Sequence, residues 1–246
     1  MRRYRSSAGE SREGVVTMSR TGKTTVLAVL VLLLFTGTFT VTQADPPNTY
    51  EGDSLYAAVE RAVFYVRALR ADGSLKDTGT GFVVRPDGTA LTASHVVNEA
   101  DAIECVLNDT SAVPCRVEVQ DASADTAVLK LFPPSDDSGA GKPFSYIPLR
   151  TRAVKIGERI YAIGYPMKNT AIITEGIVNS PRAEINGRDR MLVSSQLASG
   201  MSGGPLLDSH GYAAGVLSGS LRTMNGIHLA VDAQQALQVL EQIQEK

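Results

Sequence analysis

Three short segments of the sequence carry side chains that together suit nucleophilic hydrolysis. They are Leu91–Val97 with His95, Asp125–Leu129, and Gly200–Leu206 with Ser202. A serine hydroxyl is a weak nucleophile near neutral pH and needs a neighbouring base, a role that histidine fills well. A buried carboxylate on the other ring nitrogen fixes the tautomer of that histidine and stabilises the imidazolium. His95, Asp125 and Ser202 therefore form a candidate catalytic triad, in the chain order His, Asp, Ser.

The glycines around Ser202 fit the same chemistry. Attack on a carbonyl creates an oxyanion, and two backbone N–H groups that converge on one point stabilise it. Such a loop needs backbone angles and a close substrate approach that side chains obstruct and glycine permits. The N–H groups of Gly200 and Ser202 are the candidate oxyanion hole.

A different enzyme class shares part of this pattern. Gly200–Gly204 also satisfies the Gly-x-Ser-x-Gly elbow of the α/β-hydrolases, which would make the protein an esterase with His210 or His228 as its base. That elbow runs from a strand into a helix. Here Pro205 and the strand-like run Ala213–Ser218 follow the serine, so the sequence disfavours the esterase.

The elements that must position these residues are predicted to be short strands. After Gly73, β-branched runs alternate with Gly, Pro, Asn and Asp at intervals of about ten residues, which favours all-β barrels or sandwiches over a parallel sheet. Helices are expected over Asp53–Leu69 and near the C-terminus, where apolar residues recur at helical spacing. The predicted parts are a first barrel at about 52–131, a Pro- and Gly-rich linker at 132–144, a second barrel at about 145–231 and a helix at 232–245.

Residues 1–44 are predicted to be a targeting segment that precedes the folded domain 45–246. Thr25–Phe35 is almost uninterrupted aliphatic sequence, basic residues precede it, and Ala44 ends a small-residue cleavage pattern. These features predict a secretory signal peptide, with Met18 as a candidate true start. An uncleaved membrane anchor is the alternative, although polar residues dilute the apolar stretch below the roughly 20 residues that span a bilayer. The protein is expected outside the cytoplasm, secreted or periplasmic, and at a membrane only if this segment stays attached.

The composition excludes several other classes of protein. The 246 residues are 43% hydrophobic and 20% charged, with a formal net charge of -2. This balance disfavours disorder and provides no basic field to hold nucleic acid.

Two cysteines are too few for a disulfide-dense scaffold or a four-Cys zinc site, and no metal site is predicted. Cys105 and Cys115 lie in strand-like runs joined by a turn, which predicts a disulfide in an oxidising compartment, with two free thiols as the alternative.

Several motifs, in order along the chain, resemble one known family. They are Thr78–Val84, Leu91–Val97, Asp125–Leu131, Gly157–Pro166, Glu175–Val178 and Gly200–Leu206. With them the chain resembles the trypsin-like serine proteases of the chymotrypsin fold, and looks most like the bacterial HtrA (Deg) protease domain, over about Val59–Leu240. The resemblance implies two perpendicular, six-stranded antiparallel β-barrels with the triad in the cleft between them. It also implies a serine endopeptidase that acts on proteins or peptides through an acyl-enzyme, without a cofactor.

Some features depart from that family. Met201 stands where trypsin-type zymogens carry an Asp for a new amino terminus, so activation by such an amine is not expected. The PDZ domain usual in HtrA proteins is not expected either. The loop Ala198–Met201 lacks the usual Asn-Pro, which keeps open the alternative of a latent or non-catalytic binding protein with the protease fold.

The resemblance also suggests which residues contact the substrate. Ser218, Gly219 and Ser220 are expected beside the substrate main chain, and Gln196 near the base of the specificity pocket. No acidic residue occurs there, so a preference for Lys or Arg is not supported. His228 is a candidate receptor for an acidic side chain, with a core or surface histidine as the alternative. The oligomeric state is not predicted.

Overall fold

Short runs rich in β-branched and aromatic residues form strands through most of the chain, as their composition favours. The computed structural model describes residues 49–107, 111–132 and 142–243, which belong to one compact unit. The predicted targeting segment 1–44 and most of the predicted linker 132–144 lie outside the described residues.

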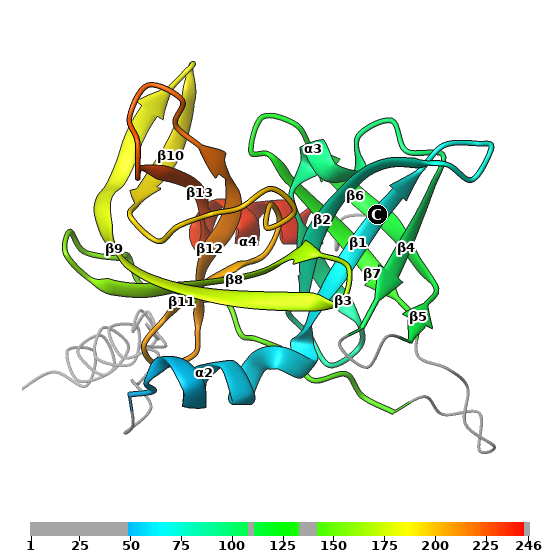
Figure 1. Ribbon diagram of the computed structural model, residues 1–246, viewed down its shortest axis with the longest axis horizontal. Helices are drawn as coiled ribbons and strands as arrows, with labels where there is room; N and C mark the ends of the chain where they lie inside the picture. The colour runs from blue at the N-terminus through cyan, green and yellow to red at the C-terminus, as the bar shows by residue number, and fades with distance from the viewer. Residues whose placement is uncertain (1–48, 108–110, 133–141, 244–246) are drawn as a thin grey trace, which may run out of the picture. The chain divides into compact units, whose positions relative to one another are not determined.

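The N-terminal half forms a curled antiparallel sheet (Figure 1). Its strands are β1 (Val63–Leu69), β2 (Leu75–Val83), β3 (Thr89–Thr92), β4 (Ala102–Val106), β5 (Ala112–Val113), β6 (Cys115–Asp121) and β7 (Thr126–Leu131). Neighbouring strands follow the order β5-β4-β1-β2-β3-β7-β6. A bond between Cys105 of β4 and Cys115 of β6 joins two of them, in agreement with the predicted disulfide.

The C-terminal half forms a closed barrel of six antiparallel strands. They are β8 (Arg159–Met167), β9 (Thr170–Ile185), β10 (Arg188–Val193), β11 (Pro205–Asp208), β12 (Ala213–Ser220) and β13 (His228–Asp232). Around the barrel the order is β10-β13-β12-β11-β8-β9. The predicted all-β class with two antiparallel barrels and a C-terminal helix is thus confirmed. The strand count differs only in the N-terminal sheet, where the short β5 pairs with β4 and adds a seventh strand.

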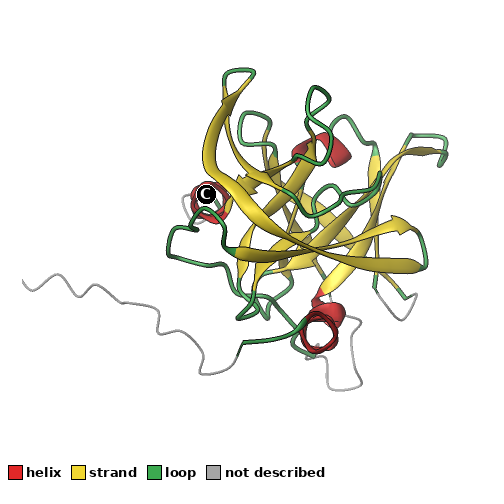
Figure 2. Cartoon of the chain, turned by 60° about the vertical axis from the view of Figure 1, so that its left-hand side comes forward, coloured by secondary structure: helices red, strands yellow, loops and turns green. Residues whose placement is uncertain are grey.

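The helices lie outside the strands (Figure 2). They are α2 (Gly52–Val59), the 3-10 turn η1 (Glu60–Ala62), α3 (Ser94–Val97) and α4 (Ala233–Glu241). The carboxylate of Asp232 caps α4 by accepting a 2.7 Å hydrogen bond from the N–H of Gln234, which explains why the helix begins there. The helix predicted over Asp53–Leu69 is wrong in its second half. Residues Val63–Leu69 form β1, because their β-branched and aromatic side chains pack inside the sheet.

Three clusters of buried side chains make up the core. One fills the N-terminal sheet around Phe64 and Leu129, and another fills the C-terminal barrel around Ile160 and Met191. The remaining cluster contains residues of both sheets and of helices α2 and α4. Full burial of an aliphatic or aromatic side chain contributes about 1.5–3 kcal/mol, so this shared cluster holds the two halves together. The candidate site lies where they meet.

Candidate active site

His95 lies on a short helical turn directly after β3. The N–H of Ser94 donates to the carbonyl oxygen of Asp125 at 3.2 Å, and the N–H of His95 donates to Oδ1 of Asp125 at 3.1 Å. The backbone of this turn is therefore bonded to the residue that precedes β7. These bonds hold His95 beside Asp125 independently of its ring.

Asp125 presents its carboxylate to the ring of His95. Nδ1 of His95 lies 2.9 Å from Oδ1 and 3.0 Å from Oδ2 of Asp125. The side chain of Asp125 is 8% exposed, whereas that of His95 is 45% exposed. Asp125 has a φ of 55°, a left-handed conformation that Asp tolerates better than most residues. A proton on Nδ1 directed at the carboxylate leaves Nε2 as the basic nitrogen of His95.

The electrostatics of this pair favour a protonated imidazole. The hydrogen bond to Asp125 raises the pKa of His95 above its ordinary value, although burial opposes the rise. Burial alone would raise the pKa of Asp125, but hydrogen bonds from His95 and Ser218 outweigh it and lower that pKa. Asp125 therefore stays ionised while His95 gains a proton, which a general base in this arrangement requires.

Ser218 connects the pair to Ser202. Its hydroxyl donates to Oδ2 of Asp125 at 2.5 Å, and its carbonyl oxygen accepts a 3.4 Å hydrogen bond from the hydroxyl of Ser202. Among the described residues, no hydrogen bond joins Oγ of Ser202 to Nε2 of His95. Ser218 thus links Asp125, which contacts His95, to Ser202.

The loop before Ser202 is a tight turn that depends on glycine. The N–H of Met201 donates to the carbonyl oxygen of Ala198 at 3.1 Å, and Gly200 has a φ of 91°. A positive φ at the third residue of such a turn favours glycine. A Cβ at Gly200 would also lie 2.6 Å from the carbonyl oxygen of Tyr165. Within the described ranges, the N–H groups of Gly200 and Ser202 donate no hydrogen bond, so both can bind an oxyanion.

Thr80 of β2 holds this loop and was missed by the sequence analysis. Its hydroxyl donates to the carbonyl oxygen of Gly200 and accepts from the N–H of Tyr165, both at 2.8 Å. Its own N–H donates to the carbonyl oxygen of Ser202, again at 2.8 Å. Thr80 is fully buried. The motif Thr78–Val84 was the available signal, but it gave no indication that its threonine contacts the nucleophile loop.

The expected substrate-binding residues lie along β12 and around it. Ser218, Gly219 and Ser220 form the end of β12 that pairs with β13, and Ser218 is the one in contact with Asp125. Gln196 is exposed and its carbonyl oxygen accepts a 2.8 Å hydrogen bond from the hydroxyl of Thr174. The structure therefore places Ser218 with the candidate triad and leaves Gln196 accessible on a neighbouring loop.

His228 is buried rather than exposed to solvent. Its Nδ1 lies 2.8 Å from the hydroxyl of Ser220, and burial lowers its pKa. Its Nε2 is buried without a hydrogen-bond partner in the described part of the protein. These features fit the alternative of a core histidine better than a receptor for an acidic side chain. His210 lies in the turn after β11, where its N–H donates to Oδ1 of Asp208 at 2.9 Å.

No group of three or more His, Cys, Asp or Glu side chains in the described ranges is arranged to hold a metal ion. The side chains gathered at Ser218 can supply a nucleophile, a base and an orienting carboxylate. That set is sufficient for acyl transfer by a serine hydrolase.

The family model that matches this chain is of a trypsin-like peptidase, and the relatives that match it are named serine endoproteases. The family described as trypsin-like peptidase domain matches residues 79–216. The chain is 29% identical over 175 residues to a DegP-like periplasmic serine endoprotease of Brucella suis, a match that covers 68% of this chain and 33% of the relative. A DegP-like protein of Ectopseudomonas mendocina is 31% identical over 171 residues, covering 67% of this chain and 35% of that protein. The chain thus spans about a third of the length of these relatives. The match to residues 79–216 confirms the predicted family, and the chain belongs to the trypsin-like peptidase domain family.

Proposed function

We propose that this chain is an exported serine endopeptidase whose catalytic residues are His95, Asp125 and Ser202. The observation that supports this most directly is the pair of contacts at 2.9 and 3.0 Å between Nδ1 of His95 and the carboxylate of Asp125. Ser202 attacks the peptide carbonyl, and Nε2 of His95 accepts the serine proton and returns it to the leaving amine. Water then releases the acyl group from Ser202 with His95 again as the base.

The oxyanion of each tetrahedral intermediate is bound by the N–H groups of Gly200 and Ser202. Neither group donates elsewhere in the described residues, and the turn at Gly200 is held by Thr80. Loss of one such donor typically costs about 3 kcal/mol of transition-state stabilisation. The peptidase domain comprises residues 45–246.

The substrates are proteins or peptides outside the cytoplasm. The relatives are named periplasmic endoproteases, and residues 25–35 have the aliphatic character of a signal peptide. In the described part of the chain, no helix is long and apolar enough to span a membrane. The formal net charge of -2 offers no attraction to nucleic acid.

A latent enzyme is the second candidate, and one observation favours it. The hydroxyl of Ser202 donates to Ser218 at 3.4 Å instead of bonding to His95. Catalytic hydrogen bonds are often long in proteins without substrate and tighten when substrate binds. A constitutive protease makes the Ser202–His95 bond when a peptide arrives, whereas a latent one needs a partner to form it.

Labelling with a fluorophosphonate tests the proposal, because only an activated serine reacts. The purified protein, Ser202→Ala and Ser199→Ala would be treated with the probe, and the modified residue mapped by mass spectrometry. Ser199 is an exposed serine of the same loop and serves as the matched control. We expect label on Ser202 in the wild type and in Ser199→Ala, and none in Ser202→Ala. Well-folded protein without label would contradict a constitutive protease and favour the latent form.

A further inference from the structure

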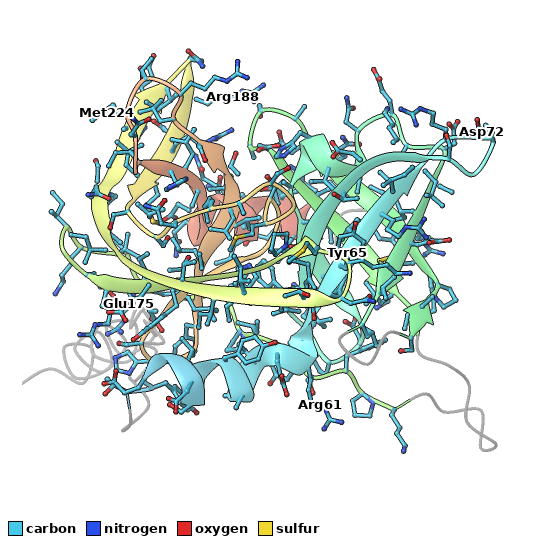
Figure 3. The ribbon with its side chains drawn as sticks, in the orientation of Figure 1. Arg61, Tyr65, Asp72, Glu175, Arg188 and Met224 are labelled. Carbon is cyan, nitrogen blue, oxygen red and sulfur yellow. A yellow bond between two sulfur atoms is a disulfide. The ribbon has the colours of Figure 1, made fainter. Side chains whose placement is uncertain are left out.

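A cavity of about 380 Å³ opens beside the candidate active site. It is lined by Ile185, Asn186, Arg188, Arg190, Ser218 and Leu229. The hairpin of β9 and β10 forms one wall and the ends of β12 and β13 form the other. Figure 3 shows Arg188 at the end of that hairpin. Because Ser218 also contacts Asp125 and Ser202, any group in this cavity lies next to the candidate triad.

Arg190 brings a buried positive charge to this cavity. The residue is only 5% exposed. Its Nη1 donates to the carbonyl oxygen of Asp189 at 2.8 Å, and among the described residues no carboxylate forms an ion pair with it. A guanidinium has five N–H donors, so most of them remain available. Burial lowers the pKa of Arg190, and the nearby carboxylates of Asp125 and Asp189 oppose this shift.

Arg150, the other buried arginine among the described residues, forms the ion pairs with carboxylates that Arg190 lacks. The side chain of Arg150 is 4% exposed and pairs with both Glu158 and Asp208. Arg190 has no such partner, and its main electrostatic attraction is to Asp125. A buried charge without a direct ion-pair partner is unfavourable, so Arg190 gains from a negatively charged ligand. A carboxylate in the cavity would compensate, through two parallel N–H···O bonds to the fork of the guanidinium.

We propose that this cavity binds a carboxylate side chain, Asp or Glu, of a substrate close to the scissile bond. The proposal rests on the proposed function, since it requires a peptide to pass Ser218. Arg190 makes the buried contact with the carboxylate, and the exposed Arg188 attracts it at the rim. None of the lining residues is acidic, so the cavity carries a net positive charge that selects against Lys and Arg. His228, the receptor expected from the sequence, does not line this cavity.

Binding is tested first without catalysis, on the full chain carrying Ser202→Ala. The side-chain Nε–H signals of arginine would be followed by NMR while N-acetyl-glutamic acid amide is added, with N-acetyl-glutamine amide as the uncharged control. We expect one signal, missing in Arg190→Lys, to shift saturably with the glutamic acid compound only. No shift of that signal, or equal shifts with both compounds, would overturn the proposal.

Specificity is tested next with the active protein. Peptides with Glu or Gln at each position around the cleaved bond would be compared by kcat/KM in the wild type, Arg190→Met and Arg190→Lys. We expect about a tenfold or greater preference for Glu at one position, as one charge-assisted hydrogen bond predicts. Arg190→Met should lose this preference because kcat/KM for the Glu peptide falls to that for the Gln peptide, while Arg190→Lys keeps part of the preference. Arg159→Gln removes an exposed charge on β8 and should leave the preference unchanged.

The two proposals fail in different ways. Cleavage that depends on Ser202 but shows no Glu preference overturns the carboxylate pocket and leaves the endopeptidase standing. A selective shift of the Arg190 signal in a protein that cleaves nothing supports the pocket and contradicts the endopeptidase.

Thermal unfolding adds a third readout, because Arg190→Met removes an unpaired buried charge. We expect an equal or higher Tm for it, and a lower Tm would indicate a structural role that contradicts the pocket.

Discussion

The hydroxyl of Thr80 donates a 2.8 Å hydrogen bond to the carbonyl oxygen of Gly200. Through it, a strand of the N-terminal sheet fixes the loop that precedes Ser202 in the other half of the molecule. The same hydroxyl accepts the N–H of Tyr165, so one atom joins β2, β8 and the nucleophile loop. The orientation of the N–H groups at Gly200 and Ser202 therefore depends on a fully buried residue of the other half.

Replacing Thr80 with valine should slow the reaction of Ser202. The change keeps the shape of the side chain but leaves the carbonyl of Gly200 and the N–H of Tyr165 without partners, at about 1–3 kcal/mol each. We expect the rate of fluorophosphonate labelling at Ser202 to fall at least about tenfold. Thr80→Ser keeps the hydroxyl and should label nearly as fast as the wild type. Equal rates for the two variants would show that the bond does not position the loop.

Replacing Asp125 with asparagine should lower the pKa of His95. The carboxylate raises that pKa in the wild type, and a neutral amide cannot. His95 acts as a base only when neutral, so wild-type activity is lost as pH falls through this raised pKa, above about 6.5. In Asp125→Asn the acid limb should move to lower pH and turnover should drop by about 10⁴. NMR titration of the imidazole measures the shift.

Asp77→Asn is the matched control for this titration, since Asp77 is exposed and contributes the weakest attraction to His95. It should lower the pKa of His95 far less than Asp125→Asn does, and identical shifts in the two variants would contradict a specific His95–Asp125 bond.

The stability of the fold depends on pH through the altered pKa values of His95 and Asp125. The stabilisation from His95 is complete below its unfolded pKa and disappears as pH rises through the folded one. The stabilisation from Asp125 is present above the pKa of Asp125 in the unfolded chain. It disappears as pH falls through the lowered pKa of Asp125 in the folded protein.

Replacing Arg150 with methionine should destabilise the C-terminal barrel. Nη1 of Arg150 lies 3.2 Å from Oδ2 of Asp208 and also bonds Glu158, and the side chain of Asp208 is 1% exposed. Removing the cation leaves a buried carboxylate uncompensated, at about 3–5 kcal/mol. Urea unfolding at pH 7 measures the loss. Arg159→Met breaks an exposed pair and should cost less than about 1 kcal/mol. Similar losses for both would mean that the cluster is not buried in solution.

Replacing both cysteines with serine should lower the free energy of unfolding by about 2–3 kcal/mol, because the bond closes a short loop in the unfolded chain. Cys105 and Cys115 are ten residues apart in sequence. Reduction of the wild type should cause a similar loss, measured by urea unfolding with and without a reductant. The double variant should be insensitive to the reductant. A wild type that is equally insensitive would show that its thiols are free.

The sequence singles out candidate residues whose chemistry is local to a motif. His95, Asp125 and Ser202 could be selected because each lies in a short pattern of its own and their order matched a known family. Thr80 and Arg190 could not be selected in that way. Thr80 acts on Gly200, which is 120 residues away, and Arg190 is notable only because no carboxylate of the described residues forms an ion pair with it.

The errors in secondary structure have local causes. Val63–Leu69 directly follows a helix, and the helical pattern was extended over it although its β-branched and aromatic residues favour a strand. Strand β9 has 16 residues, longer than the intervals of about ten residues expected from the sequence, and it ends at the turn of Asn186 and Gly187. Both turn residues have positive φ, at 52° and 74°, as a two-residue hairpin requires. The Asn-Gly pair was a signal for this hairpin that the sequence analysis did not use.

Helix α4 follows both sheets in the chain and packs against strands of each, β6 and β7 on one side and β12 and β13 on the other (Figure 1). A chain that leaves the ribosome with its amino terminus first must therefore expose the strands of both sheets before α4 can pack against them. These contacts add to the bonds of Thr80 and to the shared core cluster, which also join the half that holds His95 to the half that holds Ser202. For the endopeptidase proposed above, the site is complete only after both sheets have been synthesised, so a nascent N-terminal half is inactive.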